Sequence, residues 1–286
     1  MTLHAIEVFR DLEDGDIRFL KDLEKASKRF KWVPEDRLSI ITEMPLQDAR
    51  YRLSRLNEFE LVERGVSKYA GYKILPSGFD VLAIWDLVNQ DVLEAFGKAL
   101  GVGKEADIYD ALTPSEETVA VKFNRLGLTF TSVKKKRSYE PEREWIDASK
   151  SAAKKEFRVL KKIHPEVSVP EPVAQNRHVL VTGLIEGDEL ANVADIDLPE
   201  PVLDEILANV LDAYKLGVIH GDLSEHNVII KPDGVVLIID WPQWVSTNHD
   251  EANELLERDV NNILKYFRRK FGIERDLNET LKEIKS

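Results

Sequence analysis

Hydrophobic residues in the first 90 positions recur at spacings that predict helices and a hairpin. Apolar side chains repeat at helical spacing in three segments, where we expect amphipathic helices: 17–30, 34–43 and 46–59. Pro34 is expected in the first turn of its helix. Two strands around a polar turn are expected at 60–65 and 71–75, followed by a helix over 77–90 with Ser77 as its cap. This order predicts a winged helix-turn-helix domain over residues 1–90.

The rest of the chain mixes strands and helices in an order that predicts a second, larger domain. The pattern gives a linker helix, strands around a glycine turn, a further strand, a long helix, two short strands and a crossing segment: 91–100, 101–109, 118–123, 145–163, 173–174, 178–181 and 182–187. Helices at 201–216 and 249–271 flank a polar hairpin. We predict an α+β fold in which the winged helix precedes a compact two-lobed protein-kinase-like domain, with an N-lobe over 91–185 and a C-lobe over 186–286.

A polar loop between short apolar strands carries the strongest chemical signal. The stretch Val218–Ile230 is followed by the turn Lys231–Gly234 and by an apolar strand that ends on an acid. Asp222, Asn227 and Asp240 are therefore expected at one edge of a hairpin. Such oxygen ligands suit Mg²⁺ or Mn²⁺. Asp222 is placed to accept a hydroxyl proton and the other two to hold metal, as in kinases, which makes phosphotransfer the working hypothesis. The alternative is a hairpin tip whose side chains cap turns.

An upstream glycine turn and a lysine strand match the way that kinases bind nucleotide phosphates. The turn brings backbone N–H groups near phosphate, and its candidate binding residues are Gly101, Gly103, Lys104 and Glu105. Lys122 on the following strand is the expected phosphate-binding lysine. Glu156 is its expected ion-pair partner, with a surface salt bridge as the alternative. Backbone groups at Gly183 and Ile185 are expected to read the adenine edge.

Composition and charge narrow the class of protein. The 286 residues include no cysteine, which excludes disulfides and thiolate metal sites. No apolar run approaches the roughly 20 residues that span a bilayer, and residues 1–7 lack the pattern of a signal peptide. We therefore expect a cytoplasmic protein without a membrane partner. The formal net charge of −12 argues against indiscriminate nucleic-acid binding.

Two basic segments nevertheless favour an anionic partner. Arg50, Arg52 and Arg55 lie in the third expected helix, where they are placed to track a phosphate backbone. Ordinary solvated arginines are the alternative, because residues 1–90 hold 14 basic and 16 acidic side chains. The segment 124–139 includes Lys134–Arg137 and is expected to be a mobile loop that contacts RNA or phosphate, or else a merely solvated one. The pattern leaves open whether the winged helix binds RNA, DNA or protein.

With these residues assembled, the chain resembles the RIO family of atypical protein kinases, in particular its second, winged-helix-bearing subfamily. The segments that carry the resemblance are Gly101–Glu105, Val121–Phe123, Ile219–Asn227 and Ile239–Gln243. The resemblance implies ATP- and Mg²⁺-dependent serine/threonine kinase activity, seen as autophosphorylation or ATP hydrolysis more readily than as transfer to a protein. It also implies a role in maturation of the small ribosomal subunit, with pre-ribosomal RNA as a partner.

The resemblance also assigns roles to individual residues. It implies that Asp222 is the catalytic acid/base, that Asn227 and Asp240 hold metal, and that Lys122 binds phosphate with Glu156 as its partner. It further implies that Asp240 accepts phosphate transiently, which would make the protein a switch as much as a kinase.

Three departures from ordinary kinases modify these expectations. Ala106 stands where a third glycine, or a serine in this family, is expected, so one phosphate contact is in question. The crossing segment has Thr182–Gly183 in place of a Met-Glu pair, which leaves adenine recognition to backbone groups. No glycine follows Asp240, no Ala-Pro-Glu follows, and only 46 residues remain, 286 minus 240. We therefore expect poor phosphorylation of peptides in trans.

Two other functions stay open at this point. A small-molecule phosphotransferase of the aminoglycoside or choline kinase type fits the segment around Asp222 and the Ile239–Trp241 motif, but it gives the winged helix no role. An RNA-binding assembly factor that uses nucleotide as a conformational switch fits the winged helix. ATP turnover that rises with small acceptors tests the first. Asp222→Ala is expected to leave RNA binding intact under either the kinase or the assembly-factor idea, whereas RNA binding carried by the arginine helix should weaken with salt.

Overall fold

The computed structural model of this chain describes residues 2–66, 69–127 and 141–286, with side chains of the long helix α6 (Pro141–Ile163) from residue 145 onward. The chain forms two compact units. The first comprises residues 1–151 and 175–180, and the second comprises residues 152–174 and 181–286. The boundary passes through α6 and through strands β7 (Pro172–Asn176) and β8 (Val179–Gly183).

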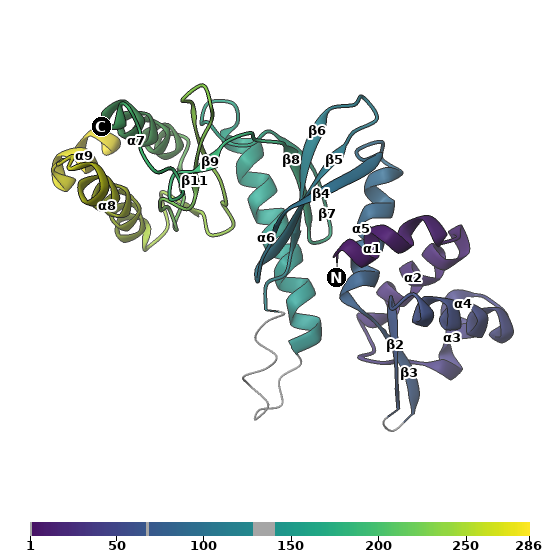
Figure 1. Ribbon diagram of the computed structural model, residues 1–286. Helices are drawn as coiled ribbons and strands as arrows, with labels where there is room; N and C mark the ends of the chain where they lie inside the picture. The colour runs from purple at the N-terminus through teal and green to yellow at the C-terminus, as the bar shows by residue number, and fades with distance from the viewer. Residues whose placement is uncertain (1, 67–68, 128–140) are drawn as a thin grey trace. The chain divides into compact units, whose positions relative to one another are not determined.

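The first unit begins with the winged helix predicted from the sequence (Figure 1). Its elements, in order, are α1 (Thr2–Val8), α2 (Asp14–Ser27), β1 (Val33–Pro34), α3 (Leu38–Thr42), α4 (Leu46–Glu58), β2 (Val62–Val66), β3 (Ala70–Ile74) and α5 (Pro76–Val88). The strands form an antiparallel sheet in the order β1-β3-β2. Leu20, Leu23, Leu53 and Leu56, on the apolar faces of α2 and α4, are buried together in one core. The helical spacing in the sequence thus produces the packing expected of it.

Two local expectations in this domain were wrong. Pro34 lies in strand β1, and a single turn of 3-10 helix (Glu35–Arg37) separates it from the short α3. The extended backbone at Pro34, with ψ of 136°, excludes it from a helix. Ser77 lies inside α5, and its hydroxyl donates to the Glu60 carbonyl, so it ties the helix to the preceding turn.

The expected linker helix over 91–100 was also wrong, because β4 (Ala95–Val102) occupies most of this range. It pairs antiparallel with β5 (Ala106–Leu112), which pairs with β6 (Thr118–Asn124), in a five-stranded sheet of order β4-β5-β6-β8-β7. The β4–β5 register shifts after Phe96 and again after Ala99. Such bulges break the period of two by which a strand is recognised in sequence.

A buried ionic cluster attaches the winged helix to this sheet. Arg125, directly after β6, donates to both carboxylate oxygens of Asp80 on α5, at 2.9 and 2.6 Å. It also donates to Asp107 on β5 at 3.3 Å and to the Thr2 hydroxyl at 2.5 Å, while His178 Nε2 lies 2.8 Å from Asp80. Burial alone would raise the pKa of Asp80, but Arg125 and His178 outweigh it and lower that pKa. All five residues are buried, so each charge depends on its partners.

The second unit holds two small sheets and three helices at its C-terminal end. Its elements after β8 are β9 (Asp188–Glu189), α7 (Pro199–Lys215), β10 (Val218–Ile219), β11 (Val228–Ile230), β12 (Val236–Ile238), β13 (Val245–Ser246), α8 (Ala252–Phe271) and α9 (Leu277–Lys285). The sheets have the orders β12-β11-β9 and β10-β13. In Figure 1, α7, α8 and α9 lie side by side, and all three contact one another. Among the described residues, no helix is long and apolar enough to cross a membrane.

Candidate phosphotransfer site

The hairpin β11–β12 positions the three polar residues expected in the site. The last paired residues of this hairpin are Val228 and Ile238. One position further, the Ile239 amide donates to the Asn227 carbonyl at 2.9 Å, so Asn227 and Asp240 flank the same end of the hairpin. In the preceding loop, His220 Nε2 lies 3.0 Å from the Ile239 carbonyl oxygen. This contact brings Asp222 to the same end. The structure therefore gathers the three residues that the sequence predicts to meet.

The side chain of Asp222 is exposed but held. Its Oδ2 accepts a hydrogen bond of 2.8 Å from Gln243 Nε2. Gly221 before it has a φ of +80°, and a Cβ there would lie 2.9 Å from the Gln243 carbonyl oxygen. Only glycine fits this left-handed and crowded position without strain. The loop conformation that exposes the Asp222 side chain thus depends on Gly221.

Asp240 adopts a backbone conformation that is rare outside glycine, with a φ of +64°. The next residue, Trp241, is buried, and its indole N–H donates to the Ile238 carbonyl at 3.0 Å. Its ring also packs against His220, with centroids 4.5 Å apart. The buried indole anchors the chain immediately after Asp240, whose own side chain stays exposed. Such outliers held by their surroundings cluster at functional sites.

Helix α8 fixes the loop around Asp222 through residues that the sequence analysis missed. Asp259 accepts the amide N–H groups of Gly221 and Leu223 at 2.7 and 3.0 Å. Asn262 donates to the Leu223 carbonyl at 3.1 Å, and Arg258 donates to the Gly221 carbonyl. The sequence signal that could have identified Asp259 is an acid on the apolar side of an amphipathic helix. In the structure this acid is 1% exposed, which is rare for an aspartate without partners.

Burial raises the pKa of Asp259 to about 6, although its two backbone hydrogen bonds act in the opposite direction. Because this pKa lies above the ordinary value of 3.8, the folded chain holds the proton more tightly than the unfolded chain. The Asp259 carboxyl therefore stabilises the fold by the full amount below about pH 4, and this stabilisation is lost as the pH rises through about 6. A shift of this size corresponds to about 3 kcal/mol.

We expect Asp259→Asn to remove this pH dependence. Relative to the variant, the wild type should lose about 3 kcal/mol of unfolding free energy between about pH 4 and pH 7, measured by urea unfolding. Asp250→Asn, at an exposed acid before α8, is the control; it keeps Asp259 and should therefore lose stability with rising pH as the wild type does. A difference between wild type and Asp259→Asn that stays constant with pH would contradict the prediction.

The glycine turn between β4 and β5 is tight and exposed. The Gly103 amide donates to the Ala106 carbonyl at 2.9 Å, which closes a four-residue loop that includes Lys104 and Glu105. The Arg125 amide donates to the Glu105 carbonyl at 2.6 Å, so the turn is fastened to the residue after β6. Gly101 belongs to β4 itself, and a Cβ there would meet nothing within 4 Å. The turn thus leaves space beside its backbone.

The other expected nucleotide residues are divided between the two units. Lys122 lies on β6 in the first unit, whereas Glu156 lies on the part of α6 that belongs to the second, where it is 3% exposed. Their ion pair stays a prediction. In the crossing segment, the Gly183 amide donates to the Glu171 carbonyl at 2.9 Å, and Ile185 follows β8. The amide of Gly183 is thus used within the protein.

Comparison with known proteins decides the family. Residues 107–280 match the family model described as the RIO domain, and residues 9–90 match the model described as Rio2, N-terminal. The chain belongs to the RIO family. It is an atypical serine/threonine protein kinase of the Rio2 type, and its fold of winged helix plus kinase domain is the one predicted.

The similarity of this RIO kinase to its relatives extends over nearly the whole chain. The RIO-type serine/threonine-protein kinase Rio2 of Methanocaldococcus jannaschii is 38% identical over 87% of this chain and 94% of its own length. The serine/threonine-protein kinase RIO2 of Caenorhabditis elegans is 34% identical over 94% of this chain, which spans about half, 52%, of that relative. A crystal structure of the Rio2 kinase–ADP/Mg²⁺–phosphoaspartate complex from Chaetomium thermophilum matches with a TM-score of 0.85 at 29% identity. The match covers 96% of this chain and 88% of the Chaetomium thermophilum chain.

The arginines of α4 in this RIO kinase are engaged inside the winged helix. Arg52 and Arg55 bind the fully buried carboxylate of Asp16 at 3.0 and 3.1 Å, while Arg50 pairs with Glu35 at 3.0 Å. Arg52 and Arg55 thus hold α4 on α2, a structural role that the sequence analysis did not consider. The basic run Lys134–Arg137 lies outside the described residues.

Proposed function

We propose that this RIO kinase is an ATP- and Mg²⁺-dependent serine/threonine kinase and ATPase that phosphorylates itself. Asp222 accepts the proton of the attacking hydroxyl group or water. Asn227 and Asp240 hold the metal, and Lys122 with Glu156 positions the phosphates. The turn residues Gly101, Gly103, Lys104 and Glu105 cover the phosphates, and the backbone at Gly183 and Ile185 faces the adenine.

The observation that carries this proposal is the hairpin end that gathers Asp222, Asn227 and Asp240. The donor set there is one amide oxygen and one carboxylate, which fits Mg²⁺ and equally Mn²⁺. Asn227 Oδ1 accepts from the Ser224 hydroxyl at 3.0 Å, which fixes its orientation and leaves its second lone pair for a cation. When bound, the metal neutralises charge on the phosphates. The chain itself orients the attacking group through Asp222.

Asp240 is also the proposed transient phosphate acceptor. One carboxylate oxygen forms a bond to the γ-phosphorus while the bond from that phosphorus to the β–γ bridging oxygen breaks, and ADP leaves. Water then attacks the phosphorus of the acyl phosphate and gives its proton to Asp222, while the bond between phosphorus and the Asp240 oxygen breaks, so that inorganic phosphate is released and the Asp240 carboxylate is restored. Support comes from the exposed side chain and strained φ of Asp240, and from the phosphoaspartate in the Chaetomium thermophilum kinase complex.

The proposal predicts two kinds of label after incubation with γ-labelled ATP and Mg²⁺. Acyl phosphate is cleaved by hydroxylamine, whereas phosphoserine and phosphothreonine resist it. We expect a hydroxylamine-sensitive label on the wild type that disappears in Asp240→Asn. Asp233→Asn is the matched control, because Asp233 is an exposed acid in the turn of the same hairpin. A label in Asp240→Asn that still yields to hydroxylamine would exclude Asp240 as the acceptor.

The role in small-subunit maturation is part of the same proposal. It rests on the implied role of the RIO family and on the winged helix, with pre-ribosomal RNA as the partner. Because Asp16 binds both Arg52 and Arg55, we assign neither of them to RNA contact. A small-subunit RNA fragment that fails to bind the wild-type chain at low salt would remove this part of the proposal.

A further inference from the structure

Gln243 is the last residue of the segment Ile239–Gln243, and the proposed function gives it no role. In the structure, its Nε2 donates to Asp222 Oδ2 at 2.8 Å. Rotation about the last bond of an aspartate side chain is only broadly restrained, so an exposed carboxylate does not by itself hold one oxygen in one direction. A hydrogen bond to Oδ2 restrains this rotation and leaves Oδ1 for another group. The direction in which Oδ1 points therefore depends on Gln243.

Gln243 lies in a tight turn that is fixed on both sides. The Trp244 amide donates to the Trp241 carbonyl at 3.3 Å, which closes a four-residue turn with Pro242 in its second position, where proline is favoured. Trp241, at the start of the turn, is 1% exposed. Directly after the turn, β13 pairs with β10. The backbone from which the Gln243 side chain extends thus has a buried indole before it and a paired strand after it.

The second tryptophan of this turn anchors it to α6. The indole N–H of Trp244 donates to the Lys155 carbonyl at 3.1 Å, and the Lys155 ammonium lies 5.8 Å from the centroid of the Trp244 ring system. Glu156, the expected partner of Lys122, is the next residue of this helix. The same stretch of α6 therefore holds the turn that contains Gln243 and carries Glu156.

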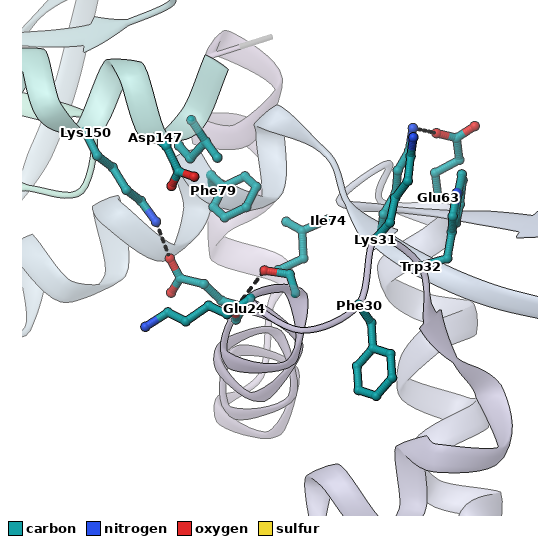
Figure 2. Close-up of a pocket in the computed structure, with 13 residues that line it drawn as sticks. Glu24, Phe30, Lys31, Trp32, Glu63, Ile74, Phe79, Asp147 and Lys150 are labelled. Atoms are coloured by element: carbon teal, nitrogen blue, oxygen red, sulfur yellow. Dashed lines mark hydrogen bonds and ion pairs between the residues drawn. The ribbon is translucent and has the colours of Figure 1, made fainter. Parts of the chain in front are cut away.

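Helix α6 is itself held along both of its halves. Apolar side chains of the half in the second unit are buried, among them Ala153, Val159, Leu160 and Ile163. In the half that belongs to the first unit, Lys150 pairs with Glu24 on α2 at 2.9 Å, and Figure 2 shows this pair at the wall of a cavity. Burial alone would raise the pKa of Glu24, but Arg177 and Lys150 outweigh it and lower the pKa to about 2, so Glu24 is charged at neutral pH. Trp244 is thus anchored to a fixed helix.

We infer that Gln243 is a positioning residue for phosphotransfer and that the turn Trp241–Trp244 places it. The inference rests on the proposed function, because it takes Asp222 as the proton acceptor. The hydrogen bond from Gln243 directs Oδ1 of Asp222 toward the attacking hydroxyl group or water. Through Trp244, this orientation is set by the helix that carries Glu156. In ordinary kinases a longer activation loop controls the position of the corresponding helix. Here a four-residue turn connects the helix to the proton acceptor.

The test measures kcat and KM for ATP from the release of labelled phosphate by the full chain with Mg²⁺. Gln243→Met keeps the approximate length of the side chain and removes the donor. We expect kcat to fall about 10–100-fold, because the orientation maintained by a hydrogen bond to a charged group is lost. KM for ATP and the free energy of unfolding should stay unchanged. Gln243→Lys supplies a donor again and should recover most of the lost turnover. Gln47→Met, at an exposed glutamine of α4, is the matched control and should keep full turnover.

A double-mutant cycle shows whether Gln243 acts through Asp222. Asp222→Ala removes the acceptor of the hydrogen bond, so adding Gln243→Met should lower the residual turnover by less than about 2-fold. A general loss of structure would instead lower turnover in both backgrounds by the same factor. Equal factors in the wild type and in Asp222→Ala would therefore overturn the inference.

Trp244→Phe tests the anchor on α6. Phenylalanine keeps an aromatic ring but lacks the N–H that binds the Lys155 carbonyl, so kcat should fall about 2–10-fold, and the change should add little to Gln243→Met. Wild-type turnover in Gln243→Met, with turnover lost in Asp222→Ala, would overturn the inference and leave the proposed function intact. Undiminished turnover in Asp222→Ala would overturn both.

Discussion

Asp222→Asn should lower ATP turnover by about 10²–10⁴-fold, because the exposed carboxylate at the end of the β11–β12 hairpin is the proposed proton acceptor. The asparagine oxygen still accepts the hydrogen bond that Gln243 donates to Asp222, so the loop geometry is expected to survive. Release of labelled phosphate from γ-labelled ATP with Mg²⁺ measures the loss. Nucleotide affinity should change little, since Asp222 is not among the proposed phosphate-binding groups.

The control for this variant is Asp250→Asn, which removes an exposed carboxylate of the same unit away from the hairpin and should keep full turnover. If Asp222→Asn turns over ATP like the wild type, the hairpin serves at most as a nucleotide sensor. The winged helix would then become the centre of the function, as the assembly-factor alternative requires.

Arg125→Met should destabilise the first unit by about 3–5 kcal/mol, the largest expected effect on folding. The guanidinium binds Asp80, Asp107 and Thr2, none of which is more than 7% exposed. Methionine fills much of the space but leaves two buried carboxylates without their cation. Urea unfolding at neutral pH, followed by far-UV circular dichroism, measures the loss.

Two further variants show whether the cost comes from the unpaired charges. Arg64→Met removes a half-exposed arginine that lies 3.7 Å from Glu35, and it should cost at most about 1 kcal/mol. Adding Asp80→Asn to Arg125→Met removes one of the stranded charges and should restore part of the stability. A loss under about 1 kcal/mol for Arg125→Met would show that water or movement of the chain compensates the buried acids.

Local patterns in the sequence predicted those parts of the fold that depend on short-range order. The helices α2 and α4, the hairpin β2–β3 and the hairpin β11–β12 each have an apolar period or a turn signal within a few residues. The placement of Asn227 and Asp240 at one end of a hairpin also followed from local signals, because β11 and β12 pair as neighbouring strands. Hydrophobic periodicity and turn residues involve positions that are close together in the chain, so they can be recognised in one amino-acid sequence.

Tertiary structure decided the features in which distant segments meet. The bulged β4 becomes a strand by pairing with β5, although its own residues favour no clear period. Asp259 supports the loop around Gly221 from 38 positions away, and Arg125 finds Asp80 45 positions away. Arg52 and Arg55, which looked like surface cations, are bound to buried Asp16. A charge is stable in such places only through partners that the fold supplies, and those partners leave no periodic trace along the chain.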